Sequence, residues 1–221
     1  MGRNISFAPG EFYNLYNRGT EKRNIFSSKN DYERFLTLLY LSNGDRPVHL
    51  QLQGRTLKEV AETGSVRGKL LVEVCAYVLM PNHFHLLVRE KEDGGISLFM
   101  QKLLTGYTMY FNKRHNRTGA LFQGKFKATH ADTDRYLTYL FAYIHLNPVK
   151  LIEPKWKENG ITNRLRAEKY IGTYPYSSFP EYLGAERPEH VLIDTSVLPT
   201  YADSSKKFKN MVTEWLAYKA E

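Results

Sequence analysis

The feature that most constrains the fold is an apolar run that leads through a short turn into a second run. Residues 70–80 are almost continuously apolar, which is the pattern of a central strand buried on both faces. Pro81-Asn82 marks a turn, and residues 83–89 resume a strand pattern. Strands joined by so short a turn pair antiparallel, so the segment predicts a β-hairpin.

The flanking sequence alternates between strand and helix patterns. The other predicted elements are strands at 12–16 and 121–129 and helices at 31–41, 96–114 and 133–146, the last capped by Asp132 or Thr133. The order is β-α-β-β-α-β followed by a helix. We therefore predict an α+β fold with a ferredoxin-like core and an added C-terminal helix.

Two further segments lack the pattern of the core. Residues 43–69 are polar and rich in glycine, and they predict an excursion with one short helix at 57–61. Residues 151–221 predict a mostly irregular, partly helical extension, with a short amphipathic helix at 206–220. We divide the chain into a core at 1–150 and an extension at 151–221 that packs on the core or contacts the ligand of the core.

Positive charge is concentrated in one stretch. Residues 111–130 contain five basic residues and no acidic one, which is +5 of the net +8 of the chain. A local basic excess suggests a polyanionic partner, although a solvated surface explains charge alone equally well. The single cysteine, and the lack of an apolar signal segment or of a membrane span, favour a reducing cytoplasm.

His83 and His85 are candidate metal ligands. On a strand, their side chains lie on one face and Phe84 lies on the other. Two histidines alone are also compatible with polar residues on an open sheet face. Tyr143 and Asn147 lie one turn apart on the last predicted helix, and an asparagine oxygen suits Mg²⁺ or Mn²⁺. Imidazoles alone would suggest Zn or Fe, so the donor types leave the metal open. His145 should point elsewhere.

At this point the sequence resembles a known family. The segments 80–88, with His-Phe-His, and 143–150, with Tyr-Ile-His-Leu-Asn-Pro, resemble the single-tyrosine HUH transposases and their REP-associated branch. The segments 13–19, 119–127 and 174–179 also match that branch, in the same order along the chain.

The resemblance implies cleavage and rejoining of single-stranded DNA at hairpins of palindromic repeats, through a covalent 5′-phosphotyrosine. It implies Tyr143 as the nucleophile and His83, His85 and Asn147 as ligands of Mg²⁺ or Mn²⁺. The expected partner is hairpin-forming single-stranded DNA, and the expected location is the cytoplasm, in association with the nucleoid. A homodimer and a monomer both stay open. The residues that we expect to contact DNA are basic: Arg18, Lys113, Arg114, Arg117, Lys125 and Lys127.

The chain contains sixteen tyrosines, so the choice of one as the nucleophile has to be justified. Tyr136 and Tyr139 share a helix face with Tyr143, but only Tyr143 precedes Asn147 by one turn. Two other functions stay open: a non-catalytic protein that binds DNA hairpins, and a metallonuclease in which water attacks. An RNA substrate is a further variant. The hydroxyl of Tyr143 is essential only for strand transfer.

Overall fold

The computed structural model describes residues 5–48, 56–63, 67–198 and 204–217. Its centre is a four-stranded antiparallel sheet with the strand order β2-β3-β1-β4. The strands are β1 (Phe12–Arg18), β2 (Val72–Met80), β3 (His83–Glu90) and β4 (Lys127–His130). β2 and β3 form the predicted hairpin, and the predicted α+β fold class is confirmed.

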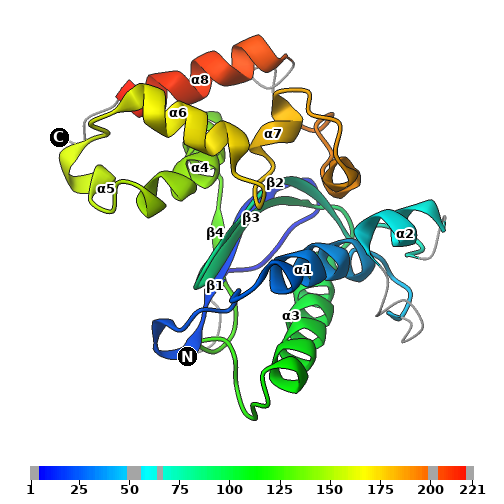
Figure 1. The fold of residues 1–221 in the computed structure, drawn as a ribbon. Coiled ribbons are helices and arrows are strands. Elements are labelled where there is room, and N and C mark those ends of the chain that lie inside the picture. The colour runs from blue at the N-terminus through cyan, green and yellow to red at the C-terminus, as the bar shows by residue number, and fades with distance from the viewer. Residues whose placement is uncertain (1–4, 49–55, 64–66, 199–203, 218–221) are drawn as a thin grey trace.

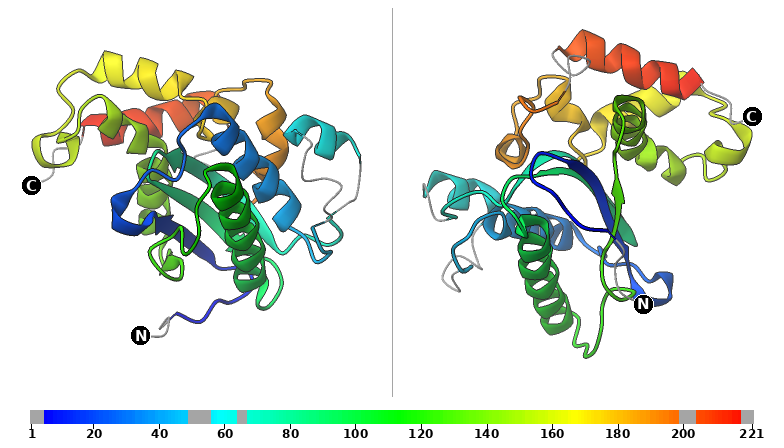
Figure 2. Two further views of the ribbon diagram at one scale, coloured as in Figure 1. Left: turned by 60° about the horizontal axis from the view of Figure 1, so that its bottom comes forward. Right: turned by 180° about the vertical axis from the view of Figure 1, so that it is seen from behind.

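Helices cover both faces of the sheet (Figure 1). On one side lie α1 (Lys29–Ser42) and α3 (Gly95–Arg114), with the short helix α2 (Leu57–Glu62) beside α1. On the other side lies α4 (Asp134–Leu146), which follows β4 and carries Tyr143. Two other viewing directions show the same separation into two helical layers (Figure 2).

Because side chains alternate along each strand, they contribute to two separate buried clusters, one on each face of the sheet. On β3, Phe84, Leu86 and Val88 pack with α1 and α3, whereas Leu87 packs with α4. His83 and His85 share the face of Leu87. The strand pattern therefore places both imidazoles on the side of the sheet that α4 covers.

The chain after α4 is more helical than its proline content predicts. The 3-10 segment η3 (Asn147–Leu151) leads into a series of helices: α5 (Trp156–Asn159), α6 (Arg164–Thr173), α7 (Phe179–Tyr182) and α8 (Ser205–Ala217). Phe208 of α8 is fully buried against Phe141 of α4. Packing against α4 thus stabilises helices too short to persist alone. The end of the predicted helix at 206–220 lies outside the described residues. The domain division at residue 150 stays a prediction.

The predicted strand at 121–129 is mostly wrong. Only Lys127–His130 form β4, and residues 121–126 form a loop that makes one bridge, between Phe122 and Gly19. Gly124 has a φ of +79°, which interrupts a strand. Phe122 and Phe126 are buried from this loop, so their spacing reflects anchoring in the core rather than strand alternation.

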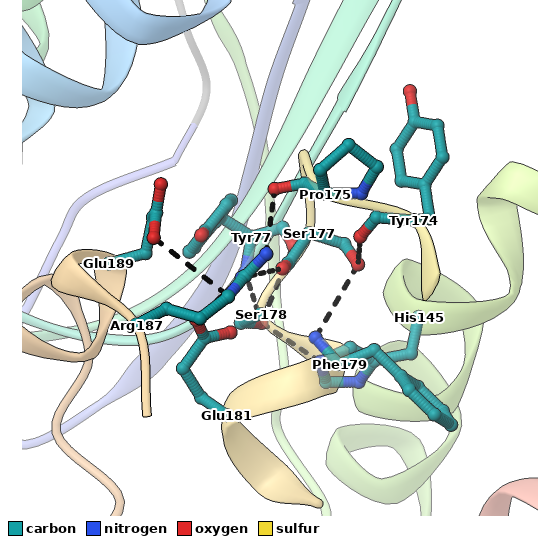
Figure 3. Close-up of polar contacts among 10 residues, drawn as sticks. All are labelled: Tyr77, His145, Tyr174, Pro175, Ser177, Ser178, Phe179, Glu181, Arg187 and Glu189. Atoms are coloured by element: carbon teal, nitrogen blue, oxygen red, sulfur yellow. Dashed lines mark hydrogen bonds and ion pairs between the residues drawn. The ribbon is translucent and has the colours of Figure 1, made fainter. Parts of the chain in front are cut away.

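His145 connects α4 to the sheet through the segment before α7 (Figure 3). Its Nδ1 lies 2.9 Å from the carbonyl oxygen of Phe141, and its Nε2 lies 2.9 Å from the hydroxyl of Ser178. The same hydroxyl accepts a hydrogen bond from the backbone N–H of Tyr77 on β2. Burial lowers the pKa of His145 to about 3, so the ring is neutral. These bonds fix α4, and hence Tyr143, against the sheet.

Arg187 holds this segment from its other side (Figure 3). Its guanidinium donates to the buried carboxylate of Glu181 and to the carbonyl oxygens of Pro175 and Ser177. The Glu181 side chain is fully buried, and burial raises its pKa. The carboxylate therefore depends on Arg187 for its charge compensation.

We predict that Arg187→Ala lowers the free energy of unfolding at neutral pH by about 3 kcal/mol, because it leaves a buried carboxylate unpaired. In this variant the folded-state pKa of Glu181 stays above its unfolded value, so protonation removes the cost as the pH falls. Urea unfolding at pH 7 and pH 5 measures both effects. Arg164→Ala, on the exposed start of α6, is the control and should change stability by less than about 0.5 kcal/mol. A loss that does not shrink at pH 5 would contradict this account.

Across the described residues, no helix is both long and apolar enough to cross a lipid bilayer.

Candidate functional site

A cavity of about 300 Å³ lies where the histidine-bearing face of the sheet meets α4 and α5. Strand register sets one wall, because Tyr16 pairs with His85 and Arg18 with His83 across β1 and β3. The lining residues are Tyr16, Asn17, Arg18, His83, His85, Gln123, Lys127, Tyr143, Asn147, Lys150 and Lys157. Residues from four distant parts of the chain therefore meet in one place.

The two imidazoles open into this cavity with their ring centroids 5.4 Å apart. Each ring has an asparagine oxygen beside its Nδ1: Asn82 Oδ1 at 2.7 Å from His83, and Asn14 Oδ1 at 3.2 Å from His85. An amide oxygen only accepts, so each Nδ1 carries the proton. This tautomer leaves the Nε2 lone pair of both rings available to a metal ion.

Both histidines are neutral at physiological pH. Burial and, to a smaller extent, the nearby guanidinium of Arg18 lower the pKa of His83 to about 4, although the side chain of Asn147, as a hydrogen-bond acceptor, raises it. Burial lowers the pKa of His85 to about 3, assisted by His83 and the ammonium of Lys157. Neutral imidazole is the form that coordinates metal, so no proton has to be displaced at pH 7.

Tyr143 and Asn147 enter the cavity from the end of α4. The ring of Tyr143 stands edge-on to His85, with 5.4 Å between centroids. The side chain of Asn147 is buried, and its Nδ2 donates to the carbonyl oxygen of Tyr143 at 3.1 Å, so Oδ1 is the atom that could act as a ligand. Lys157 of α5 donates to Tyr143 Oη at 2.8 Å.

This set of donors could hold a divalent cation. It offers two imidazole nitrogens and one amide oxygen, and it leaves further coordination positions open to a phosphate. The described residues contain no group of three His, Cys, Asp or Glu side chains that could hold a metal, and Asn147 is the residue beside the histidines that could supply an oxygen donor. The cavity lining contains four cations and, among the described residues, no carboxylate, which suits an anionic ligand.

The residues predicted to bind DNA do not all gather at the cavity. Arg18 and Lys127 line it. Arg114 lies 3.6 Å from the buried carboxylate of Asp31, and Arg117 donates to Asn112. Lys113 is exposed at the end of α3, and Lys125 lies in a separate depression against α3. The basic stretch is thus divided between the cavity and the side of the protein formed by α3.

Sequence reasoning missed several residues of the site: Asn14, Tyr16, Asn82, Gln123, Lys150 and Lys157. Asn14 and Tyr16 were accessible to the same alternation argument as the histidines, because residues 14, 16 and 18 share one face of β1. Lys150 and Lys157 follow the helix, and no periodic pattern places them.

We predict that Asn82→Ala weakens Mn²⁺ binding by about 10- to 100-fold, because His83 loses the partner that sets its tautomer and orientation. Electron paramagnetic resonance of free Mn²⁺ measures this affinity without requiring activity. Asn210→Ala, exposed on α8, is the matched control. Equal affinity of the Asn82 variant and wild type would show that the hydrogen bond does not support a metal ligand.

Comparisons with known proteins agree with this geometry. Residues 52–147 match the model of the family described as transposase IS200 like. A solved structure of a REP-associated tyrosine transposase bound to a REP hairpin shares the fold, with a TM-score of 0.50 and 12% identity over 86% of this chain and 90% of that one. A search of curated proteins gave no match. Residues 52–147, which contain the histidine pair, Tyr143 and Asn147, are therefore similar to the IS200-like transposases, and the chain has the fold of a REP-associated tyrosine transposase.

Proposed function

We propose that this protein binds hairpin-forming single-stranded DNA and cleaves and rejoins it through a covalent 5′-phosphotyrosine on Tyr143. The observation that carries the proposal is the meeting of Tyr143, His83, His85 and Asn147 in one cation-lined cavity. The family match and the fold of the hairpin-bound relative support a DNA substrate.

Geometry favours Tyr143 over the other tyrosines of its helix. Tyr136 and Tyr139 lie along α4, stacked on each other with centroids 5.9 Å apart, and neither lines the cavity. Tyr16 does line it, but its ring packs nearly parallel on His85. Tyr143 has its hydroxyl bonded to an ammonium group. It is therefore the phenol best placed to attack a phosphate held in the cavity.

The proposed reaction is a transesterification. As the bond from Tyr143 Oη to phosphorus forms, the bond from phosphorus to the 3′ oxygen breaks. The phenolic proton ends on the 3′ oxygen, which leaves as a hydroxyl. Attack by a 3′-hydroxyl on the phosphotyrosine reverses the process, so strands are rejoined without a nucleotide cofactor.

His83, His85 and Asn147 would hold the divalent cation, with Mg²⁺ and Mn²⁺ as the candidates. When bound, the ion neutralises charge on the phosphate oxygens. The imidazoles and the amide are neutral ligands, so they would leave the positive charge of the cation uncompensated. That charge favours simultaneous binding of the phosphate. Arg18, Lys127 and Lys150 add positive charge around the same space.

The basic residues predict a salt dependence that can be measured. Lys127→Gln and the double change Lys113→Gln with Arg117→Gln should each weaken hairpin binding. Each lost phosphate contact should flatten the slope of log K against log salt by about 0.7 on single strands and 0.9 on duplex. Lys58→Gln, exposed on α2, is the control. Unchanged slopes would mean that these side chains are only solvated.

The proposed function is tested by incubating the protein with labelled single-stranded DNA from the flanks of its own gene and Mg²⁺. A denaturing gel should show a protein–DNA adduct that requires the cation and disappears with EDTA. Cleavage without any adduct would favour a hydrolase in which water attacks. Binding without cleavage, under conditions where the metal is bound, would favour a non-catalytic binder of hairpins.

A further inference from the structure

Lys157 is in contact with the proposed nucleophile, although it lies ten residues beyond the family match. Its Nζ lies 2.8 Å from Tyr143 Oη and 4.1 Å from the centroid of the tyrosine ring. The ammonium therefore both donates to the oxygen and sits over the ring face. Among the described residues no carboxylate forms an ion pair with it, so its charge is available to another anion.

The loop that carries Lys157 is closed by its own hydrogen bonds. The carboxylate of Glu153 accepts hydrogen bonds from the backbone N–H groups of Thr162 and Asn163 and from the hydroxyl of Thr162. The ring of Trp156 packs against the buried cluster around α4. Because both ends of the loop are fixed, Lys157 is presented to the cavity from α5 at low entropic cost.

The other cations of the cavity occupy different positions. Arg18 and Lys127 come from the sheet, and Lys150 follows α4, but no hydrogen bond joins any of them to Tyr143 Oη among the described residues. A phosphate that becomes joined to Oη must place its non-bridging oxygens next to the group already bonded to Oη. That group is Lys157.

We propose that Lys157 is a catalytic residue of strand transfer, which fixes the Tyr143 hydroxyl and then binds the phosphate that the tyrosine acquires. This inference rests on the proposed function. In cleavage the Oη–phosphorus bond forms, the bond to the 3′ oxygen breaks, and the phenolic proton ends on that oxygen. Lys157 stays an ammonium throughout and donates to the oxygens on which negative charge develops. It acts equally in the reverse step, so it accelerates cleavage and rejoining alike.

The test compares Lys157→Ala, Lys157→Gln and Lys157→Arg with Lys155→Ala, a control on the same loop outside the cavity lining. Single-turnover formation of the adduct is measured at saturating hairpin DNA and Mg²⁺, together with the Kd for the hairpin. Lys157→Ala and Lys157→Gln should slow adduct formation by about 100- to 1,000-fold and change Kd by less than about fivefold. Arginine should restore part of the rate, because it keeps the charge.

Rejoining, started from isolated adduct and a 3′-hydroxyl strand, should be slowed by the same factor. If Lys157 has only a structural role, the Gln and Arg variants should lose the same factor in the rate of adduct formation, or the Kd for the hairpin should rise without a loss in rate. Either result overturns the inference. So does a rate within threefold of wild type, or the same deficit in Lys155→Ala. If wild type cleaves DNA but forms no adduct, the proposed function itself fails. That outcome is seen in the wild-type protein, whereas failure of the inference about Lys157 is seen only in the variants.

Discussion

Replacing Tyr143 with phenylalanine is expected to abolish both DNA cleavage and the covalent adduct. The change removes one oxygen and keeps the ring that stands edge-on to His85 and stacks on Tyr139. Because no other group in the chain is expected to substitute for the nucleophile, the rate should fall by at least about 10³-fold. Hairpin affinity should stay nearly unchanged, as measured by fluorescence anisotropy.

Tyr136→Phe and Tyr139→Phe are the matched controls, since they make the same change on the same helix away from the cavity. Both should retain activity. If the Tyr143→Phe variant still forms an adduct, the nucleophile would have to be reassigned to Tyr136 or Tyr139. Retained cleavage with no adduct in any variant would instead establish the hydrolytic reaction.

Removal of a metal ligand is expected to have a comparable effect. His85→Ala deletes a ring that burial keeps neutral and that a hydrogen bond to Asn14 orients. Metal-dependent cleavage should fall by at least about 100-fold, and Mn²⁺ affinity, measured by electron paramagnetic resonance, by more than about tenfold. The hairpin should still bind, because most phosphate contacts come from other residues.

His130→Ala provides the control for this change. His130 lies on β4 with its Nε2 2.8 Å from the carboxylate of Glu11, on a partly exposed part of the sheet. The His130→Ala variant should bind Mn²⁺ and cleave DNA as the wild-type protein does. Normal Mn²⁺ affinity in the His85 variant would contradict the assignment of the histidine pair as metal ligands.

Periodicity explains which parts of the site could be predicted from the sequence. A strand places His83 and His85 on one face, and one helical turn places Tyr143 beside Asn147. The structure brings both pairs into the same cavity. The strand pairing that joins them depends on non-local contacts, and the resemblance to a family, rather than spacing, predicted that the two pairs meet.

Other parts of the site follow no periodic rule. Lys157 reaches Tyr143 because the carboxylate of Glu153 closes the loop that carries Lys157. Neither a lysine nor a glutamate at these positions predicts the contact with Tyr143 from the sequence. Residues 121–126 form a loop and not the predicted strand, because Gly124 has a positive φ and Phe122 and Phe126 are anchored in the core. The short helices after α5 depend on packing against α4, which local propensity does not contain.

The attachment point of the DNA tests the central claim most directly. Adduct formed on a labelled hairpin with Mg²⁺ would be digested with a protease and a nuclease, and the modified peptide sequenced by mass spectrometry. We predict a nucleotide joined through its 5′ phosphate to Tyr143, in a peptide from α4. Attachment to any other residue, a 3′-linked nucleotide, or cleavage products that never carry protein would contradict the account.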